Sequence, residues 1–159
     1  MRGAVKVFVL LFICLFLVAP KDQNVRGRVS SVTDGDTLKV TLGSTLVRVR
    51  LAEIDSPEIR QPGGVESKKA LSRKVLGRQV RVLSEGYDRY GRLLAHIYEG
   101  KQHINYDMVK EGHAWAYRRY LKDEKFLFAE ENARDQKLGV WDKRKDGAIA
   151  PWKWRKGKR

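Results

Sequence analysis

Three short clusters of acidic and basic residues carry the side chains of this sequence that could do chemistry. They are the runs at residues 34–37 (DGDT), 50–58 (RLAEIDSPE) and 88–92 (DRYGR). Carboxylate oxygens are the ligands that hard divalent cations prefer, and arginine binds phosphate through paired hydrogen bonds. A metal, a carboxylate that handles water and guanidinium groups together supply what phosphodiester hydrolysis requires. Taken together, the clusters predict this reaction.

Each cluster also has a purely structural interpretation. The runs at 34–37 and 88–92 are typical of tight turns, and the acids of the second run could simply point into water. Arg50 and Asp55 are five positions apart, so a regular strand would place them on opposite faces. Both reach one site only if the chain bends before Ser56, and Pro57 favours such a bend.

In this order and spacing, the three clusters resemble the staphylococcal (micrococcal, thermonuclease-type) nucleases over residues 25–141. The resemblance implies an OB-fold enzyme that uses calcium to cut DNA and RNA. It implies that Asp36 and Asp55 bind Ca²⁺ through their carboxylates and Ser56 through its backbone carbonyl.

The same resemblance implies roles for residues that touch the substrate. Glu58 acts on the attacking water as general base or positioner, while Arg50 and Arg92 bind the scissile phosphate. Tyr90 lies near the nucleotide. The tyrosine that stacks on a base does not align uniquely, and the candidates are Tyr117 and Tyr120.

The elements that must position these residues follow from hydrophobic periodicity. Alternating apolar residues predict three consecutive strands over 25–52, with turns at 34–36 and 43–44, and two more strands at 79–83 and 92–98. Helical patterns cover 66–76, 105–112 and 123–138, with Asn105 as the expected N-cap of the second helix. Five short strands with a helix between the third and fourth predict an α+β protein, mostly a five-stranded Greek-key OB-fold barrel, with three α-helices.

The N-terminus has the pattern of a secretory signal peptide. Arg2 and Lys6 precede the uncharged apolar run of residues 7–19, which is shorter than the roughly 20 residues of a membrane span. We therefore expect a signal peptide at 1–19, a linker at 20–24 and a secreted or periplasmic protein, with an uncleaved membrane anchor as the alternative. Cys14 is the single cysteine. After cleavage the chain would have no disulfide and no membrane attachment.

The charge balance points to polyanionic partners. Lys and Arg number 33 against 19 Asp and Glu, which gives a formal charge of +14. Such a surplus attracts nucleic acid or an anionic membrane surface. We expect DNA and RNA as substrates and a monomer without a stable protein partner. The alternatives are a non-catalytic nucleic-acid-binding OB-fold module and a membrane-surface binder, neither of which explains three acids close to Arg50.

The remaining residues divide into one domain and a tail. We assign residues 25–142 to the nuclease-like domain and 143–159 to a basic tail that contains Trp152 and Trp154. We expect this tail to have no core of its own and to act as a tether for nucleic acid, with anchoring of a poorly ordered tail to the barrel as the alternative. His96, His103 and His113 are scattered and lack the spacing of a zinc site or an acid–base pair.

Overall fold

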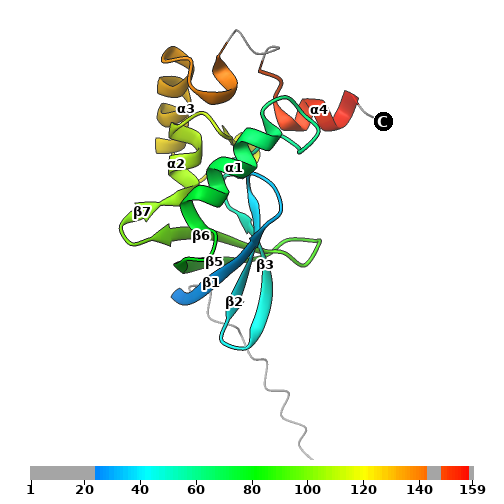
Figure 1. The fold of residues 1–159 in the computed structure, drawn as a ribbon. Coiled ribbons are helices and arrows are strands. Elements are labelled where there is room, and N and C mark those ends of the chain that lie inside the picture. The colour runs from blue at the N-terminus through cyan, green and yellow to red at the C-terminus, as the bar shows by residue number, and fades with distance from the viewer. Residues whose placement is uncertain (1–23, 143–147, 158–159) are drawn as a thin grey trace, which may run out of the picture.

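A computed structural model of the protein describes residues 24–142 and 148–157 (Figure 1). The predicted signal peptide at 1–19 and the linker at 20–24, apart from Asn24, lie outside the described residues. Among the helices that are described, none combines the length and the apolar composition needed to cross a membrane.

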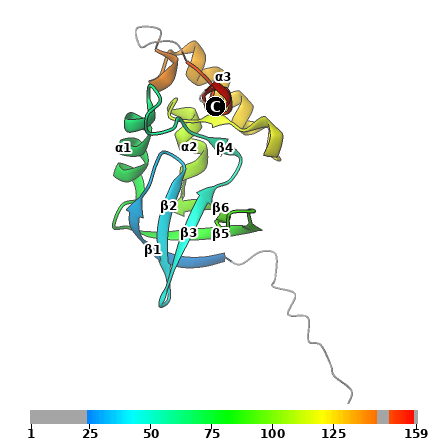
Figure 2. The same ribbon diagram turned by 90° about the vertical axis from the view of Figure 1, so that its right-hand side faces the viewer.

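A closed barrel of five strands forms the body of the molecule (Figures 1 and 2). Its neighbours follow the order β3-β2-β1-β5-β6, and parallel pairing of β3 with β6 closes it. The strands are β1 (Asn24–Val32), β2 (Thr37–Leu42), β3 (Thr45–Leu51), β5 (Gln79–Tyr87) and β6 (Leu93–Glu99). The expected five-stranded OB-type barrel is confirmed.

The barrel interior is filled by the apolar half of each alternating strand. The fully buried side chains include Leu38 and Val40 of β2, Val49 of β3, Val82 of β5 and Ile97 of β6. Because strand side chains alternate between faces, their neighbours in sequence point outward. The period-two pattern of the sequence is therefore the pattern of barrel inside and outside.

Within the described residues, three short strands and four α-helices complete the fold, and the helices gather at one end of the barrel (Figures 1 and 2). The short strand β4 (Ile54–Asp55) pairs with β8 (Trp115–Ala116), and β7 (Gln102–His103) extends the main sheet beside β6. The helices are α1 (Gly64–Val75), α2 (Ile104–Lys110), α3 (Lys125–Asp135) and α4 (Pro151–Gly157), with 3₁₀ turns η1 (Arg118–Tyr120) and η2 (Gly139–Trp141). The first three match the expected helices, and α4 was not expected.

Asn105 does not cap the second helix, so that expectation is wrong. Helix α2 begins at Ile104, and its N-cap is His103, two residues before Asn105. The Asn105 side chain is buried, where it accepts a hydrogen bond from the Ile97 amide and donates to the carbonyls of Ala52 and Ala95. A buried amide needs such partners, and two groups of β6 and one of the turn after β3 supply them.

The described part of the C-terminal segment is anchored to the domain, which was the alternative to a nucleic-acid tether. Ala150 is buried in a second apolar cluster that contains Trp115 and Trp141, and the Trp152 ring stacks on Tyr117 at 5.8 Å. The Gln61 side-chain amide donates a hydrogen bond to the Ile149 carbonyl. Helix α4 therefore packs on the domain, although its length gives it no core of its own.

Two of the histidines that look scattered in sequence meet in space. His96 Nδ1 lies 3.0 Å from His103 Nε2, and the ring of His103 stacks on Tyr98. His96 Nε2 also lies 3.2 Å from Glu85 and 3.4 Å from Glu53. Burial first, and then the nearby charge of His96, lower the pKa of His103 to about 4.

This pKa predicts how stability depends on pH. Between the unfolded value of 6.5 and the folded value of about 4, the unfolded chain binds more protons at His103 than the folded chain does. The free energy of unfolding should therefore fall as pH falls through this window. His103→Phe should be less stable at pH 7, because it loses the hydrogen bond to His96, but it should lose less stability on acidification. Urea unfolding from pH 7 to pH 4 measures both; an unchanged pH dependence in the variant contradicts the assignment.

Candidate active site

A buried arginine joins two buried carboxylates at the C-terminal end of β3. Arg50 Nη2 lies 3.0 Å from Asp55 Oδ1 and 3.2 Å from Asp36 Oδ2. The exposed fractions of the three residues are 8% for Arg50, 1% for Asp55 and 5% for Asp36. Charges this deeply buried are tolerated because each has a partner.

A sharp turn brings Arg50 and Asp55 to the same site. Strand β3 ends at Leu51, Glu53 adopts a left-handed backbone conformation with φ of 64°, and the chain resumes as β4. Arg50 Nη1 donates to the carbonyls of Leu51 and Ile54 at 2.8 and 2.9 Å, and so holds this turn. The bend expected before Ser56 is present, but it lies at Glu53 rather than at Pro57.

The loop at residues 34–37 fixes the position of Asp36. The Asp36 amide donates to Asp34 Oδ1, and Asp36 Oδ2 accepts a 2.7 Å hydrogen bond from the Ser56 amide. A Cβ atom on Gly35 would lie 1.9 Å from Ser67 Oγ, so only glycine lets this loop approach α1 so closely. The central residue of the DGD run is thus required by packing.

Burial and neighbouring carboxylates raise the pKa of two acids at this site, Asp34 and Asp55. Desolvation, followed by the charge of Asp36, raises the pKa of Asp34 to about 6. Burial also raises the pKa of Asp55, while hydrogen bonds and charge from Arg155 and Arg50 oppose the rise. The acidic groups are therefore held in a site that favours added positive charge.

Glu58 stands at the rim of the site. The Glu58 side chain is 45% exposed. Its backbone is held by Gln61, whose backbone N–H donates to the Glu58 carbonyl at 2.8 Å. A Cβ atom on Gly64 would lie 1.9 Å from that same carbonyl. The start of α1 therefore presses directly on the Glu58 backbone.

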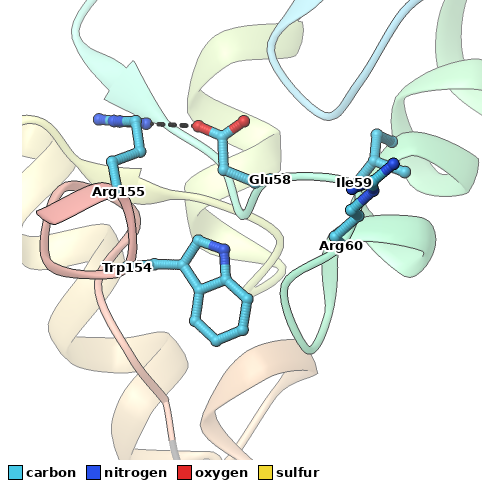
Figure 3. Close-up of a pocket in the computed structure, with 5 residues that line it drawn as sticks. All are labelled: Glu58, Ile59, Arg60, Trp154 and Arg155. Atoms are coloured by element: carbon cyan, nitrogen blue, oxygen red, sulfur yellow. Dashed lines mark hydrogen bonds and ion pairs between the residues drawn. The ribbon is translucent and has the colours of Figure 1, made fainter. Parts of the chain in front are cut away.

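Sequence reasoning missed Arg155 of α4, which reaches into the site. Its guanidinium lies 2.7 Å from Asp55 Oδ2 and 2.7 Å from Glu58 Oε1, as Figure 3 shows for Glu58. The only sequence signal was that a basic residue follows Trp154 in the tail. Nothing in the spacing could pair it with carboxylates almost a hundred residues away.

Arg92 occupies the neighbouring turn. Its Nε atom donates to Asp88 Oδ2 at 2.7 Å, and Asp88 Oδ1 accepts from the amides of Tyr90 and Arg92. These hydrogen bonds lower the pKa of Asp88, although burial opposes them. In the parallel pairing, Leu94 lies beside Arg50. The turn that carries Arg92 therefore adjoins the strand that carries Arg50, although the ion pair of Arg92 is made with Asp88.

The three candidate tyrosines have different surroundings. Tyr90 is exposed, with the guanidinium groups of Arg89 and Arg92 over its ring at 4.9 and 5.6 Å. Tyr117 stacks on Trp152, and its ring also meets that of Tyr120 edge-on at 5.0 Å. The Tyr120 side chain is exposed.

Asp36 and Asp55 present the oxygen donors that calcium requires. Across residues 24–142 and 148–157, no group of three or more His, Cys, Asp or Glu side chains is arranged to hold a metal ion. In place of such a cluster, the oxygens of Asp55 face Arg50 and Arg155, and Glu58 is joined to Asp55 through Arg155. The two carboxylates are the donor type that a hard cation prefers, and the Ser56 amide adjoins them through its hydrogen bond to Asp36.

Glu53 belongs to a different part of the structure from Asp55 and Glu58. Its side chain is buried and accepts hydrogen bonds from the amides of Lys122 and Asp123, in the segment that leads into α3. Its backbone carbonyl accepts from the Tyr117 amide at 2.7 Å. This acid ties the turn between β3 and β4 to the segment that leads into α3.

Comparison with known proteins places the chain in a family. The family model described as "Staphylococcal nuclease homologue" matches residues 48–143. An uncharacterized endonuclease of Haemophilus influenzae is 45% identical over 148 residues, which are 92% of this chain and 82% of that protein. The micrococcal nuclease of Shigella flexneri is 38% identical over 91% of this chain and 88% of its own length. The staphylococcal-like nuclease CAN1 of Arabidopsis thaliana is 38% identical over 70% of this chain and 34% of its own length.

The geometry predicts that the two candidate arginines differ in their contribution to stability. Arg50→Met leaves the buried Asp36 and Asp55 short of a partner and removes donors from two carbonyls, so it should cost about 3 kcal/mol of folding free energy. Arg92→Met breaks a more exposed ion pair and should cost about 1 kcal/mol or less. Urea unfolding at neutral pH compares them. Equal losses would mean that Arg50 does not hold the turn.

Proposed function

The chain belongs to the staphylococcal nuclease family, and from this we propose that it is a secreted, calcium-dependent nuclease that hydrolyses phosphodiester bonds of both DNA and RNA. The family gives the nuclease activity and the nucleic-acid substrates. The observation that supports the calcium-dependent reaction is the pair of buried carboxylates held side by side on Arg50, with Glu58 at the rim. Polyanion binding alone does not require this combination.

Asp36 and Asp55 are the side chains that would hold Ca²⁺, with the backbone carbonyl of Ser56 as a third donor. Bound calcium supplies positive charge that polarises the phosphoryl group. The Ser56 amide and Thr37 hydroxyl hydrogen-bond to Asp36 and set the direction of its oxygens. Arg50 does the same for Asp55, so the donors are oriented before any ligand arrives.

Glu58 is the carboxylate that would orient the attacking water and accept its proton. Its half-exposed position lets it meet both solvent and substrate, whereas Asp36 and Asp55 are buried. Arg50 and Arg92 stabilise the negative charge that builds on the phosphate oxygens. Because Arg92 pairs with Asp88 through Nε, that ion pair does not consume its terminal nitrogens.

The proposed substrates follow from the charge of the protein and from a site whose assigned groups address the phosphate and the base rather than the sugar. A formal charge of +14 attracts either nucleic acid. The groups assigned above all address the phosphate, and Tyr90, Tyr117 or Tyr120 would supply a stacking face that any base fits. We therefore propose cleavage of DNA and RNA alike by a monomer that leaves the cytoplasm through its N-terminal signal.

The second candidate function is a non-catalytic nucleic-acid-binding OB-fold module. Such a module would keep the barrel and the positive surface without needing Glu58 or the buried acids. The two functions separate on one measurement, which is whether purified protein converts supercoiled plasmid and RNA to fragments.

We expect cleavage of plasmid DNA and of RNA to require calcium and to stop when a chelator is added. Asp36→Ala should weaken Ca²⁺ binding by about tenfold or more and lower turnover, because it removes a charged ligand. Glu131→Ala, which removes an exposed carboxylate on α3, is the matched control and should change neither. Full activity in excess chelator would rule out the calcium-dependent mechanism.

We expect Glu58→Gln to lower kcat by on the order of 100-fold with little change in KM, because it removes the group that handles water. Arg92→Ala should lower kcat/KM by about 100-fold, and Arg92→Lys should restore little, since lysine lacks the planar fork. Arg89→Ala removes the same charge from the same turn and serves as control. Steady-state kinetics on a short oligonucleotide checks these values, and wild-type kinetics in Arg92→Ala would remove that residue from the site.

A further inference from the structure

The contact between Arg155 and the site carboxylates is a feature that the proposed mechanism leaves unused. Arg155 spans both oxygens of Asp55, with Nη2 at 2.7 Å from Oδ2 and Nη1 at 3.3 Å from Oδ1. The same Nη1 lies 2.7 Å from Glu58 Oε1. Arg155 therefore binds a residue proposed to hold calcium and the residue proposed to handle water.

A cation and Arg155 cannot use the same oxygens at the same time. Calcium lies roughly 2.3–2.6 Å from its oxygen ligands, which is inside the space that a guanidinium at hydrogen-bond distance fills. The two positive charges would also repel each other across a few ångströms of poorly hydrated protein. Binding at Asp55 thus requires Arg155 to withdraw.

Of the two arginines on Asp55, only Arg155 is free to move. Arg50 is nearly closed off from water and also holds two backbone carbonyls. The Arg155 side chain is 41% exposed and lines the edge of a pocket of about 420 Å³ with Glu58, Arg60 and Trp154 (Figure 3). It can turn into this open space, because the charged head is hydrated there and costs little.

Helix α4 itself need not leave when Arg155 turns away. Its N-terminal half is held independently by the buried Ala150, by the stack of Trp152 on Tyr117 and by the hydrogen bond from Gln61 to Ile149. Arg155 is therefore kept at high local concentration beside the carboxylates, whether or not it is bound to them. Residues 151–157 also lie beyond the segment that the family model matches.

We propose that Arg155 competes with the divalent cation for Asp55 and Glu58 and thereby sets how tightly the site binds it. The guanidinium neutralises the carboxylates while the cation is absent and is displaced when the cation binds. This inference rests on the proposed calcium site. It assigns to α4 the control of cation affinity, rather than the tethering of nucleic acid.

The test is a calorimetric titration of the full chain with CaCl₂ at low ionic strength, where charge interactions are least screened. Arg155→Gln removes the competing charge and keeps a polar side chain, so its Kd should fall by about tenfold or more relative to the wild type. Arg155→Lys keeps the charge but loses the fork, and its Kd should lie in between. Lys156→Gln removes one charge from the next residue of α4 and should bind calcium within about twofold of the wild type.

Thermal unfolding gives a second readout that does not depend on activity. Calcium that binds the native state raises Tm, so a fixed calcium concentration should raise Tm more in Arg155→Gln than in the wild type. Equal Kd values in the wild type and Arg155→Gln would overturn the competition while leaving the calcium site intact. Equal tightening in Lys156→Gln would also overturn it, because the effect would then be one of general charge.

Failure of the calcium site itself looks different. Combining Asp55→Ala with Arg155→Gln should abolish the tight binding gained by the single variant. If the double variant still binds calcium tightly, or if no variant binds it, the proposed calcium site is wrong and this inference falls with it.

Discussion

Arg50 carries a positive charge into the wall of the barrel, where it and its two carboxylate partners are almost fully buried. Burying Asp36 and Asp55 without a cation would cost several kcal/mol each, so the guanidinium is what lets them sit side by side. The same side chain donates to the carbonyls of Leu51 and Ile54 and so closes the turn that places Asp55. One residue therefore neutralises the site and fixes its backbone. A ligand that binds here meets oxygens whose directions are already set.

The site divides into a fixed part and a part that can move. Asp36, Asp55 and Arg50 are buried and hydrogen-bonded to backbone or to one another. Glu58, Arg92 and Arg155 are at least partly exposed, and each is held by contacts at the surface. This division suits the chemistry, because ligands for a cation benefit from rigidity, whereas groups that exchange protons with water or follow a phosphate need access to solvent. Of the three arginines, Arg50 belongs to the fixed part, whereas Arg92 and Arg155 belong to the part that can move.

The segment from Glu53 to Glu58 connects the barrel to the helices. Glu53 points toward the start of α3, and Asp55 points toward Arg50 in the barrel wall. Glu58 lies at the rim, so each of these three neighbouring acids has different contacts. Pairing of β4 with β8 and the Glu53–Tyr117 backbone bond attach this segment to the chain that continues into the helices. Stacking of Trp152 on Tyr117 then places α4 on the same support, which is how Arg155 arrives at Asp55.

The sequence by itself determined the barrel, three of the four described helices, and the two acidic clusters that meet at Arg50. Alternation of apolar residues depends on local backbone geometry, and the DGDT and RLAEIDSPE runs lie where strands end, so both could be read from neighbouring residues. The sequence also required a bend between Arg50 and Asp55, although only the structure placed it at Glu53, where a left-handed conformation is held by surrounding packing. Tertiary structure alone decided the contacts between residues far apart in the chain. Asn105 bridges strands rather than capping its helix, His96 and His103 share a hydrogen bond, and Arg155 binds Asp55. Such pairings depend on how whole elements pack, and no local pattern of residue types records which distant carboxylate or carbonyl a side chain will meet.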